Sequence, residues 1–502
     1  MRQIFLVAVL LMSGLRNTAA EPESSQELAQ AIIDNDIERV RSVAANGADL
    51  KTPIFGATPL HLAAEYGRGE IAALLLEKGV EIDAVDNLQR TPLLWAARNQ
   101  HGEVAELLVT RGADVNREDP SRFRGPSNDS PYPTPLDFAI HSGNFKLCQI
   151  LAKAGAKIRK DDFNRLKRAI YSDHPEILSW LIDRGMDPTA HGQDFDSAFT
   201  AAGATANVEM IRVLVTRSHN ASVLKILLNE ALQHAAEYGQ ITVVRFLLDN
   251  TKVDLNRQIE SSYGGLSRMD DLNRQSPRYT ALSRAVENGR DEILRALLDK
   301  GGKVAGKTRS GAPVLSFVIS QGRKDIFQLL MKFKPPLDAV DIDGRTALMT
   351  AVMKNDVEIA TALLQGGAAI DKPDRYGATA LMLACGEGEK AASEFLVGAG
   401  AKIGIRDKDG GSALMNAVNG CQPGLCALLI SKGASVKESQ KATGMTALHL
   451  AAKKPCPTAI RELLADGAAT EARDKQGNTP LELARLSGDP ESIKLLEDAK
   501  SH

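Results

Sequence analysis

Seven stretches in the second half of this sequence begin at a nearly constant spacing. The first five starts are 33 residues apart, and the last two follow after 34 and 33 residues. They are Thr280, Pro313, Thr346, Thr379, Ser412, Thr446 and Thr479. The same template continued toward the N-terminus gives starts at Gln26, Thr58, Thr91, Thr134, Asn164, Ser197 and Glu230. A fixed period of this length is typical of repeat architectures, so these fourteen starts predict an array of stacked units.

Each unit reads as two helices followed by a polar hairpin. From Thr346, a short apolar helix, a turn and a longer helix ending in Leu-Leu precede a glycine and a polar turn. A threonine hydroxyl can cap the first helix, and proline fits the first helical turn. Leu60, Ala63 and Ala64 recur in other units at helical spacing, so they are expected to form the core. These features predict an all-α repeat solenoid.

Glycine is expected to mark two turns in every unit. One glycine follows the second helix, where a left-handed residue can end it. Another follows the aspartate of the polar hairpin, where a positive φ is needed. The hairpin glycines are Gly344, Gly377, Gly410 and Gly477, each three residues after Asp341, Asp374, Asp407 and Asp474.

The template also predicts the domain organisation. Residues 21–56 and 479–502 are expected to be capping repeats, because one face of each end unit meets water. Residues 57–253 and 280–478 are expected to be the two repeat arrays. Two insertions break the period at hairpin positions, one near 117–133 and one at 254–279. Such insertions project from one side of a stack, where they serve as binding loops or are simply tolerated.

The first twenty residues resemble a secretory signal peptide. Arg2 precedes an apolar run from Ile4 to Met12, and small residues end at Ala20. The alternative of a membrane anchor is disfavoured, because the run is shorter than the ~20 residues that span a bilayer. No cysteine follows the run that could carry a lipid. Residues 1–20 therefore predict an exported protein, periplasmic or secreted, with no stable membrane anchor after cleavage.

Charge and cysteine content exclude several classes of protein. A net charge of -2 gives no field that would attract nucleic acid, so no nucleic-acid partner is expected. Five cysteines are too few for a disulfide-stapled small domain. Cys421 and Cys426 lie five residues apart around a turn and could be bridged, and Cys456 in the next unit is a rival partner. Cys148, Cys385 and Cys426 otherwise fit buried apolar positions.

The first helix carries the motif that places the chain in a known family. TPLHLA from Thr58 to Ala63, and TALHLA from Thr446 to Ala451 with alanine for proline, resemble the signature of the ankyrin repeat family. The resemblance covers nearly the whole chain after residue 20 and is specific for the fold. It implies a curved solenoid whose short helices and hairpins form a concave recognition surface for other proteins.

No residues outside this repeat pattern suggest catalysis. His61 and His449 occupy one position of the first helix, where Leu94, Met349 and Met382 stand in other units. Their imidazoles are expected to bond the capping hydroxyl and tie one hairpin to the next. The sequence contains no zinc-ligand spacing, phosphate loop or nucleophile elbow, so neither a metal nor a cofactor is expected.

Candidate partner contacts lie at the ends of first helices, at hairpin tips and in the two insertions. The resemblance implies that these helix and hairpin positions vary with the partner, and aromatic and arginine side chains commonly anchor protein interfaces. The candidates are Tyr66, Leu88, Arg90, Trp95, Arg98, Asn99, Arg122, Phe123, Tyr132, Tyr238, Tyr263, Met353 and Tyr376. Their density is highest in the N-terminal third, which is the expected interface.

Three functions remain open at this point. The first is a non-enzymatic, monomeric scaffold that binds one or more proteins outside the cytoplasm. The second is an accessory of an enzyme or toxin, as inhibitor, immunity factor or effector, with the activity in the partner. The third is catalysis, which would require a role for residues such as His234 or Cys421 outside the repeat pattern.

Overall fold

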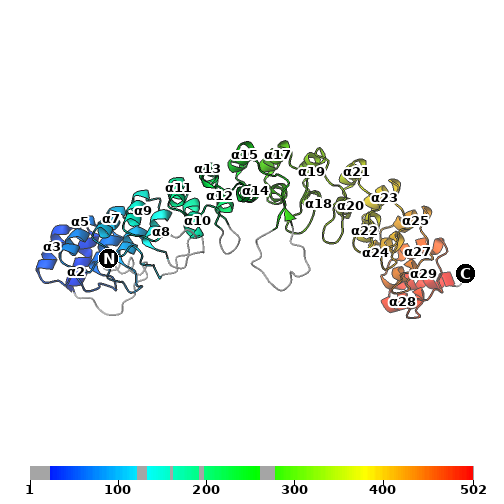
Figure 1. Ribbon diagram of the computed structural model, residues 1–502. Helices are drawn as coiled ribbons and strands as arrows, with labels where there is room; N and C mark the ends of the chain where they lie inside the picture. Colours follow the sequence, from blue (N-terminus) through cyan, green and yellow to red (C-terminus); the bar gives the residue numbers. More distant parts are fainter. Residues whose placement is uncertain (1–22, 121–132, 159–161, 191–196, 261–277, 501–502) are drawn as a thin grey trace. The chain divides into compact units, whose positions relative to one another are not determined.

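The computed structural model describes residues 23–120, 133–158, 162–190, 197–260 and 278–500. It divides into two compact units, residues 1–253 and 254–502. Within the described residues, 28 helices, α2 to α29, follow one another in fourteen pairs, seven in each unit (Figure 1). The prediction of an all-α repeat solenoid is confirmed. The expected signal peptide lies outside the described residues.

The N-terminal unit consists of the first seven helix pairs. They are α2 (Glu23–Ile33), α3 (Ile37–Ala45), α4 (Pro59–Glu65), α5 (Gly69–Glu77), α6 (Pro92–Arg98), α7 (Gly102–Thr110), α8 (Pro135–His141), α9 (Phe145–Lys153), α10 (Phe163–Tyr171), α11 (Pro175–Asp183), α12 (Ala198–Ala204), α13 (Val208–Arg217), α14 (Ala221–Tyr238) and α15 (Ile241–Asn250). Even-numbered helices are the first of each pair, and odd-numbered helices are the second.

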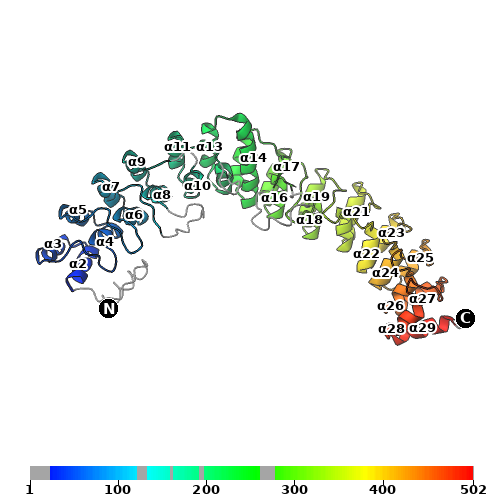
Figure 2. The same cartoon turned by 60° about the horizontal axis from the view of Figure 1, so that its bottom comes forward.

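The C-terminal unit has the same organisation. Its helices are α16 (Ala281–Glu287), α17 (Asp291–Asp299), α18 (Val314–Ser320), α19 (Lys324–Met331), α20 (Ala347–Met353), α21 (Val357–Gln365), α22 (Ala380–Glu387), α23 (Lys390–Gly398), α24 (Ala413–Gly420), α25 (Leu425–Ser431), α26 (Ala447–Lys453), α27 (Pro457–Ala465), α28 (Pro480–Ser487) and α29 (Pro490–Lys500). A short antiparallel pair, β1 (Ile259–Glu260) and β2 (Arg278–Tyr279), precedes α16. Figure 1 and Figure 2 both show the first helices α18, α20, α22 and α24 in one row. The second helices α19, α21, α23 and α25 form another row.

The capping residues predicted from the sequence start the first helices. The Thr58 side chain accepts the backbone N–H of His61, and Pro59 occupies the first turn of α4. Thr91 and Thr346 cap α6 and α20 in the same way. Such a cap stabilises a helix by about 1 kcal/mol, which matters for first helices of only seven residues. These short helices are therefore stable only because they are capped and packed.

Left-handed glycines end the second helices and close the hairpins. Gly112, just after α7, has a φ of 92°, and Gly377 at a hairpin tip has a φ of 86°. The hairpin aspartates stabilise the turns by accepting backbone N–H groups. Asp374 Oδ1 accepts those of Tyr376 and Ala378 at 2.8 and 2.9 Å. Both predicted uses of glycine are confirmed.

The core runs along each unit between the two rows of helices. Leu60, Ala63 and Ala64 are fully buried, as are their counterparts Leu93 and Ala96. Each buried leucine contributes about 1.5–3 kcal/mol relative to exposure, and the small alanines let first helices pack closely. The helices in contact belong to the same pair or to adjacent pairs, as in the contacts of α6 with α4, α7 and α8. The core of each unit is thus built mainly from contacts between helices that are neighbours in the sequence.

One helix departs from the repeat template. α14 runs without interruption from Ala221 to Tyr238, through the start expected at Glu230. Asn220 caps it by accepting the backbone N–H groups of Ser222 and Val223. The stretch contains no glycine or proline that would break the helix, so a helical turn replaces the hairpin. None of the helices in the described ranges is long and apolar enough to cross a bilayer.

Candidate functional site

The hairpins stand on the same side of each unit as the first helices, and backbone hydrogen bonds join their tips. The Asn87 N–H donates to the Gly56 carbonyl at 3.0 Å in the N-terminal unit. In the C-terminal unit the N–H groups of Arg375 and Lys408 donate to the carbonyls of Asp343 and Tyr376, each at 2.9 Å. We call the first helices with their hairpins the hairpin side. The tips therefore form a continuous row within the C-terminal unit.

Two of the expected partner contacts are buried and hold the fold instead. Trp95 is 3% exposed and Arg90 is 5% exposed. The Asp86 carboxylate accepts from Arg90 Nε at 2.8 Å and from Trp95 Nε1 at 2.9 Å. The Arg90 guanidinium also lies 4.6 Å from the centre of the Trp95 ring. The hairpin folds back over α6 and covers both side chains, so they are unsuited to contact a partner in this structure.

His61 connects this cluster to the preceding first helix. Its Nδ1 accepts the Thr58 backbone N–H at 3.2 Å, so Nε2 carries the proton and donates to the Arg90 carbonyl at 2.9 Å. Burial lowers the pKa of His61 from 6.5 to about 4, so the ring is neutral at pH 7. His449 makes the equivalent bonds to Thr446 and to the Asn478 carbonyl. The predicted role of both histidines as ties between hairpins is confirmed.

Other residue types occupy the position of His61 in other pairs. Asp137 accepts from the Thr134 backbone N–H at 2.8 Å, and Glu482 accepts from that of Thr479 at 2.6 Å. Ser283 does the same for Thr280 at 3.0 Å. In these pairs the side chain accepts one backbone N–H group, whereas Leu94 at the same position has no acceptor, so the position serves helix capping and needs no chemistry specific to imidazole.

The other N-terminal candidates lie at the surface. Arg98 and Asn99, at the end of α6, are exposed, whereas Tyr66 and Leu88 are half-buried. The Arg98 guanidinium lies 3.6 Å from the buried Asp119 carboxylate. Burial and the adjacent Glu65 charge raise the pKa of Tyr66 to about 12, so its hydroxyl stays protonated. These residues remain available as contacts, although the described part of this unit exposes no cluster of aromatic side chains with them.

Glu65, next to Tyr66, is a half-buried acid that sequence reasoning missed. Its Oε2 atom is shielded from solvent and has no hydrogen-bond partner. Burial raises its pKa to about 7, against the opposing effect of the Arg90 charge. Nothing in its sequence context distinguishes it from an exposed glutamate at a helix end.

The remaining candidates fall into two groups. Tyr376 is 55% exposed at a hairpin tip, Tyr238 is 47% exposed at the end of α14, and Met353 is half-buried at the end of α20. The Tyr238 ring stacks on that of His234, with centres 6.2 Å apart. Arg122, Phe123, Tyr132 and Tyr263 lie outside the described residues.

Several exposed apolar side chains were not among the candidates. The largest exposures belong to Leu486 at 78% and Ile342 at 67%. Ile226 on α14 and Tyr171 at the end of α10 are also exposed. The repeat template could have found Ile342, since it occupies the hairpin position that carries Arg375 in the next unit.

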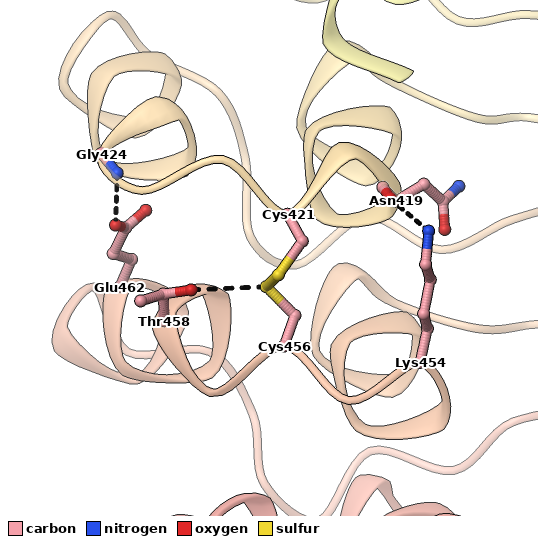
Figure 3. The surroundings of a disulfide bond; sticks show 7 residues. All are labelled: Asn419, Cys421, Gly424, Lys454, Cys456, Thr458 and Glu462. Carbon is pink, nitrogen blue, oxygen red and sulfur yellow. Dashed lines mark hydrogen bonds between the residues drawn. A yellow bond between two sulfur atoms is a disulfide. The ribbon is translucent and has the colours of Figure 1, made fainter. Parts of the chain in front are cut away.

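The disulfide joins a different pair of cysteines from the one expected first. Cys421, in the turn after α24, is bonded to Cys456, in the equivalent turn before α27, with Cα atoms 5.9 Å apart (Figure 3). The prediction of a Cys421–Cys426 bridge is wrong: Cys421 is bonded to Cys456 instead, and Cys426 is a free, buried thiol on α25. Burial raises the pKa of the Cys426 thiol to about 12, so it is unreactive near neutral pH.

This disulfide takes the place of a hydrogen bond made in other pairs. At the position of Cys456, His101 donates to the Glu65 carbonyl at 2.7 Å and Gln240 donates to the Ala204 carbonyl at 2.8 Å. Arg323 donates to the Val286 carbonyl at 2.9 Å. Each bond connects a turn to the end of the preceding first helix. Figure 3 shows three hydrogen bonds beside the disulfide: from Lys454 to the Asn419 carbonyl, from the Gly424 N–H to Glu462, and between Cys456 Sγ and the Thr458 hydroxyl.

The described residues contain no group of three or more histidine, cysteine, aspartate or glutamate side chains arranged to hold a metal ion. Besides hairpin ties, caps and ion pairs, the groups with shifted pKa values in the described part include Glu65 and the buried thiols of Cys148, Cys385 and Cys426. The arrangement can present side chains to a partner, and its polar clusters serve packing.

Comparison with known proteins matches most of the chain to one family. A family model described as ankyrin repeats (3 copies) matches residues 28–119, 166–259, 198–309, 315–407 and 414–501. GA-binding protein subunit beta-2 of Homo sapiens is 41% identical over 66 residues, which are 13% of this chain and 15% of that protein. Ankyrin repeat and KH domain-containing protein mask-1 of Caenorhabditis elegans is 26% identical over 210 residues, 38% of this chain and 8% of that protein. The similarity thus covers only a small part of each relative's length.

Proposed function

The chain belongs to the ankyrin repeat family, whose repeats serve as scaffolds for protein–protein interaction, and we propose that it is an exported, non-enzymatic, monomeric scaffold that binds a protein partner on its hairpin side. The proposal places the contacts on first helices and hairpins of the described units. It assigns no nucleic-acid partner and no cofactor.

The distribution of exposed apolar side chains carries this proposal. Of the large apolar residues that are exposed in the described ranges, all but Phe333 lie on first helices, their ends or hairpins. They are Tyr171, Ile226, Tyr238, Ile342, Tyr376 and Leu486. Apolar and aromatic groups exposed on one side of a protein mark interaction surfaces, and tyrosine is common among energetically dominant contacts.

The histidine environments support a role without catalysis. Both ring nitrogens of His61 make hydrogen bonds within the fold, and its pKa of about 4 leaves it uncharged at neutral pH. A general base needs a pKa near the working pH and a free nitrogen aimed at substrate. The His61 ring meets neither requirement.

The Cys421–Cys456 disulfide supports export. Disulfides persist in oxidising compartments such as the bacterial periplasm and the extracellular space, and are rare in the cytosol. Together with the apolar segment from Ile4 to Met12, it favours a periplasmic or secreted location. Mass spectrometry of protein from producing cells should find a chain that begins near Glu21. A product that retains residues 1–20 would refute cleavage.

Affinity capture with the immobilised chain tests the scaffold role. We expect a stoichiometric protein partner, lost when Ile342→Ala and Tyr376→Ala are combined, because both side chains are exposed at hairpin tips. Phe333→Ala is the matched control, since Phe333 is 38% exposed after the second helix α19. Loss of capture with the Phe333 variant alone would place binding on the opposite side. If the captured partner is an enzyme or a toxin, the result would favour the alternative function, in which this chain is an accessory of that partner.

A further inference from the structure

Four consecutive hairpin tips of the C-terminal unit carry exposed cations at one repeated position. These residues are Arg375, Lys408, Lys441 and Lys475, each the second residue of its hairpin turn. We call them the basic column. The residue before α20 at this position is the exposed Ile342, and Tyr376 is next to Arg375, so an apolar patch lies at one end of the column.

Backbone bonds hold the column in line. The N–H groups of Lys441 and Lys475 donate to the carbonyls of Asp409 and Thr443 at 2.7 and 2.9 Å, continuing the row of tip contacts. The aliphatic stem of Lys441 also lies close to the preceding hairpin tip. A Cβ added at Gly410 would lie 3.0 Å from Lys441 Cγ, so this stem passes over the glycine of the preceding tip. Lys408, Lys441 and Lys475 are all exposed residues, as expected where a lysine stem packs on the surface and its ammonium group stays in water.

The aspartates of the same hairpins do not cancel this charge at the surface. Asp374 and Asp474 are 7% and 6% exposed, and each accepts two backbone N–H groups of its own turn. Asp407 accepts the Gly411 N–H in the same manner. Asp409 is the only exposed carboxylate on these four tips. The tips therefore present cations outward while three aspartates face inward.

The column is largely unpaired within the chain. Arg375 lies 3.3 Å from the Asp343 carboxylate. Lys408, Lys441 and Lys475 form no ion pair with any described residue. In the N-terminal unit the described tip residue Asn87 has an uncharged amide. The basic column is therefore described for the C-terminal unit alone.

We propose that the basic column binds an extended acidic polypeptide segment of the partner, with a carboxylate at every third residue and an apolar side chain placed on Ile342 and Tyr376. This inference rests on the proposed scaffold function and names the chemistry of its partner. Packed helices are about 8–10 Å apart, which sets the spacing of successive tips. A polyproline II segment has three residues per turn and rises about 3.1 Å per residue, so one side chain per turn recurs about every 9 Å.

The charge spacing favours this partner over a polynucleotide. Double-stranded DNA carries one phosphate charge per ~1.7 Å of its axis, much denser than one cation per repeat. Asp409 on the column would also repel a continuous phosphate backbone. An acidic peptide with charges one turn apart can pair with each cation and avoid Asp409.

The test uses the full chain and fluorescent peptides of about fifteen residues, read by anisotropy at low salt. The probe peptide repeats Glu-Pro-Pro, and a second peptide has the same composition with its glutamates clustered at one end. We expect the repeating peptide to bind, with affinity falling as salt rises. Substituting Lys408→Gln, Lys441→Gln and Lys475→Gln together should weaken binding about tenfold.

A charge-matched variant controls for net charge. Lys332→Gln, Lys432→Gln and Lys494→Gln remove three exposed lysines from second helices or their ends, and should leave binding within about twofold of the unaltered chain. The proposal is overturned if the repeating peptide fails to bind, if the clustered peptide binds equally well, or if both variants behave alike. Tighter binding of a single-stranded oligonucleotide of equal charge would overturn it in favour of nucleic acid.

Capture of the natural partner separates this proposal from the scaffold function on which it rests. A partner held equally by the unaltered chain and by the Lys408, Lys441 and Lys475 variant would refute the column and leave the scaffold function standing. An unaltered chain that captures no protein would count against the scaffold function itself.

Discussion

Single residues decide which side chains of a repeat face a partner and which hold the hairpin. Asp86 is 2% exposed and bonds both Arg90 and Trp95, so one carboxylate converts two expected contact residues into structural ones. The repeat template predicted the helix and the hairpin of this unit. It could not predict that the hairpin folds over α6, since the pairing of Asp86 with Trp95 depends on three-dimensional contact nine residues apart.

Asp86→Ala tests this assignment. The substitution leaves the Arg90 guanidinium buried without its partner, so we expect a loss of about 3–5 kcal/mol in the unfolding free energy of the N-terminal unit. The chain's two tryptophans, Trp95 and Trp180, both lie in this unit, so fluorescence in a urea titration reports its unfolding. Glu81→Ala, on an exposed residue of the same hairpin, should change little. A loss below about 1 kcal/mol with Asp86→Ala would contradict the assignment.

Glu65→Gln should show a pH-dependent gain in stability. The pKa of Glu65 is raised from 4.5 to about 7 in the folded chain, so its ionisation opposes folding as pH rises through this window. The variant and the unaltered chain should be equally stable near pH 4. At pH 8 the variant should be more stable by on the order of 2–3 kcal/mol, measured by urea titration at both pH values. A constant difference across this range would show that Glu65 ionises normally.

Helices begin where the repeat template predicts when the residues beside their first turn supply the cap. Thr58 and Thr346 cap first helices, as expected from the sequence, because a cap needs only neighbouring residues. α14 and the disulfide were harder to predict for opposite reasons. The α14 region lacks breaking residues and stays helical, whereas the choice of Cys456 over Cys426 depends on which turns the stacking of adjacent pairs brings together.

The disulfide is expected to contribute substantially to the stability of the C-terminal unit. It closes a loop with a sequence separation of 35, for which chain entropy gives roughly 3–4 kcal/mol. Cys421→Ser should lower the melting temperature measured by circular dichroism. Reductant should lower the melting temperature of the unaltered chain and leave that of the variant unchanged. Equal effects of reductant on both chains would mean that another group is responsible.

At the scale of the molecule, the main contacts of each described helix are with its own pair and with adjacent pairs. Sequence periodicity predicted this architecture well, since stacking repeats at 33 residues requires only local contacts. It could not predict which surface binds, because the alignment of Lys408 with Lys441 follows from tip-to-tip contacts.

Because the helix contacts are mainly between neighbours, a core substitution should destabilise mainly the adjacent helices. Leu93→Ala in α6 removes a fully buried side chain and should cost about 2–5 kcal/mol. We expect faster amide hydrogen exchange in α4, α7 and α8, which contact α6, and unchanged exchange in α20 to α29. Faster exchange throughout the chain would show that the two units unfold together.

Amide hydrogen exchange of the full chain, alone and with its captured partner, tests the central claim most directly. The account predicts slower exchange in first helices and hairpins, above all at residues 341–345, 374–378 and 407–411. Second helices such as α21 and α23 should exchange at the same rate in both samples. Slower exchange confined to the second helices would contradict a binding surface built from the hairpin side.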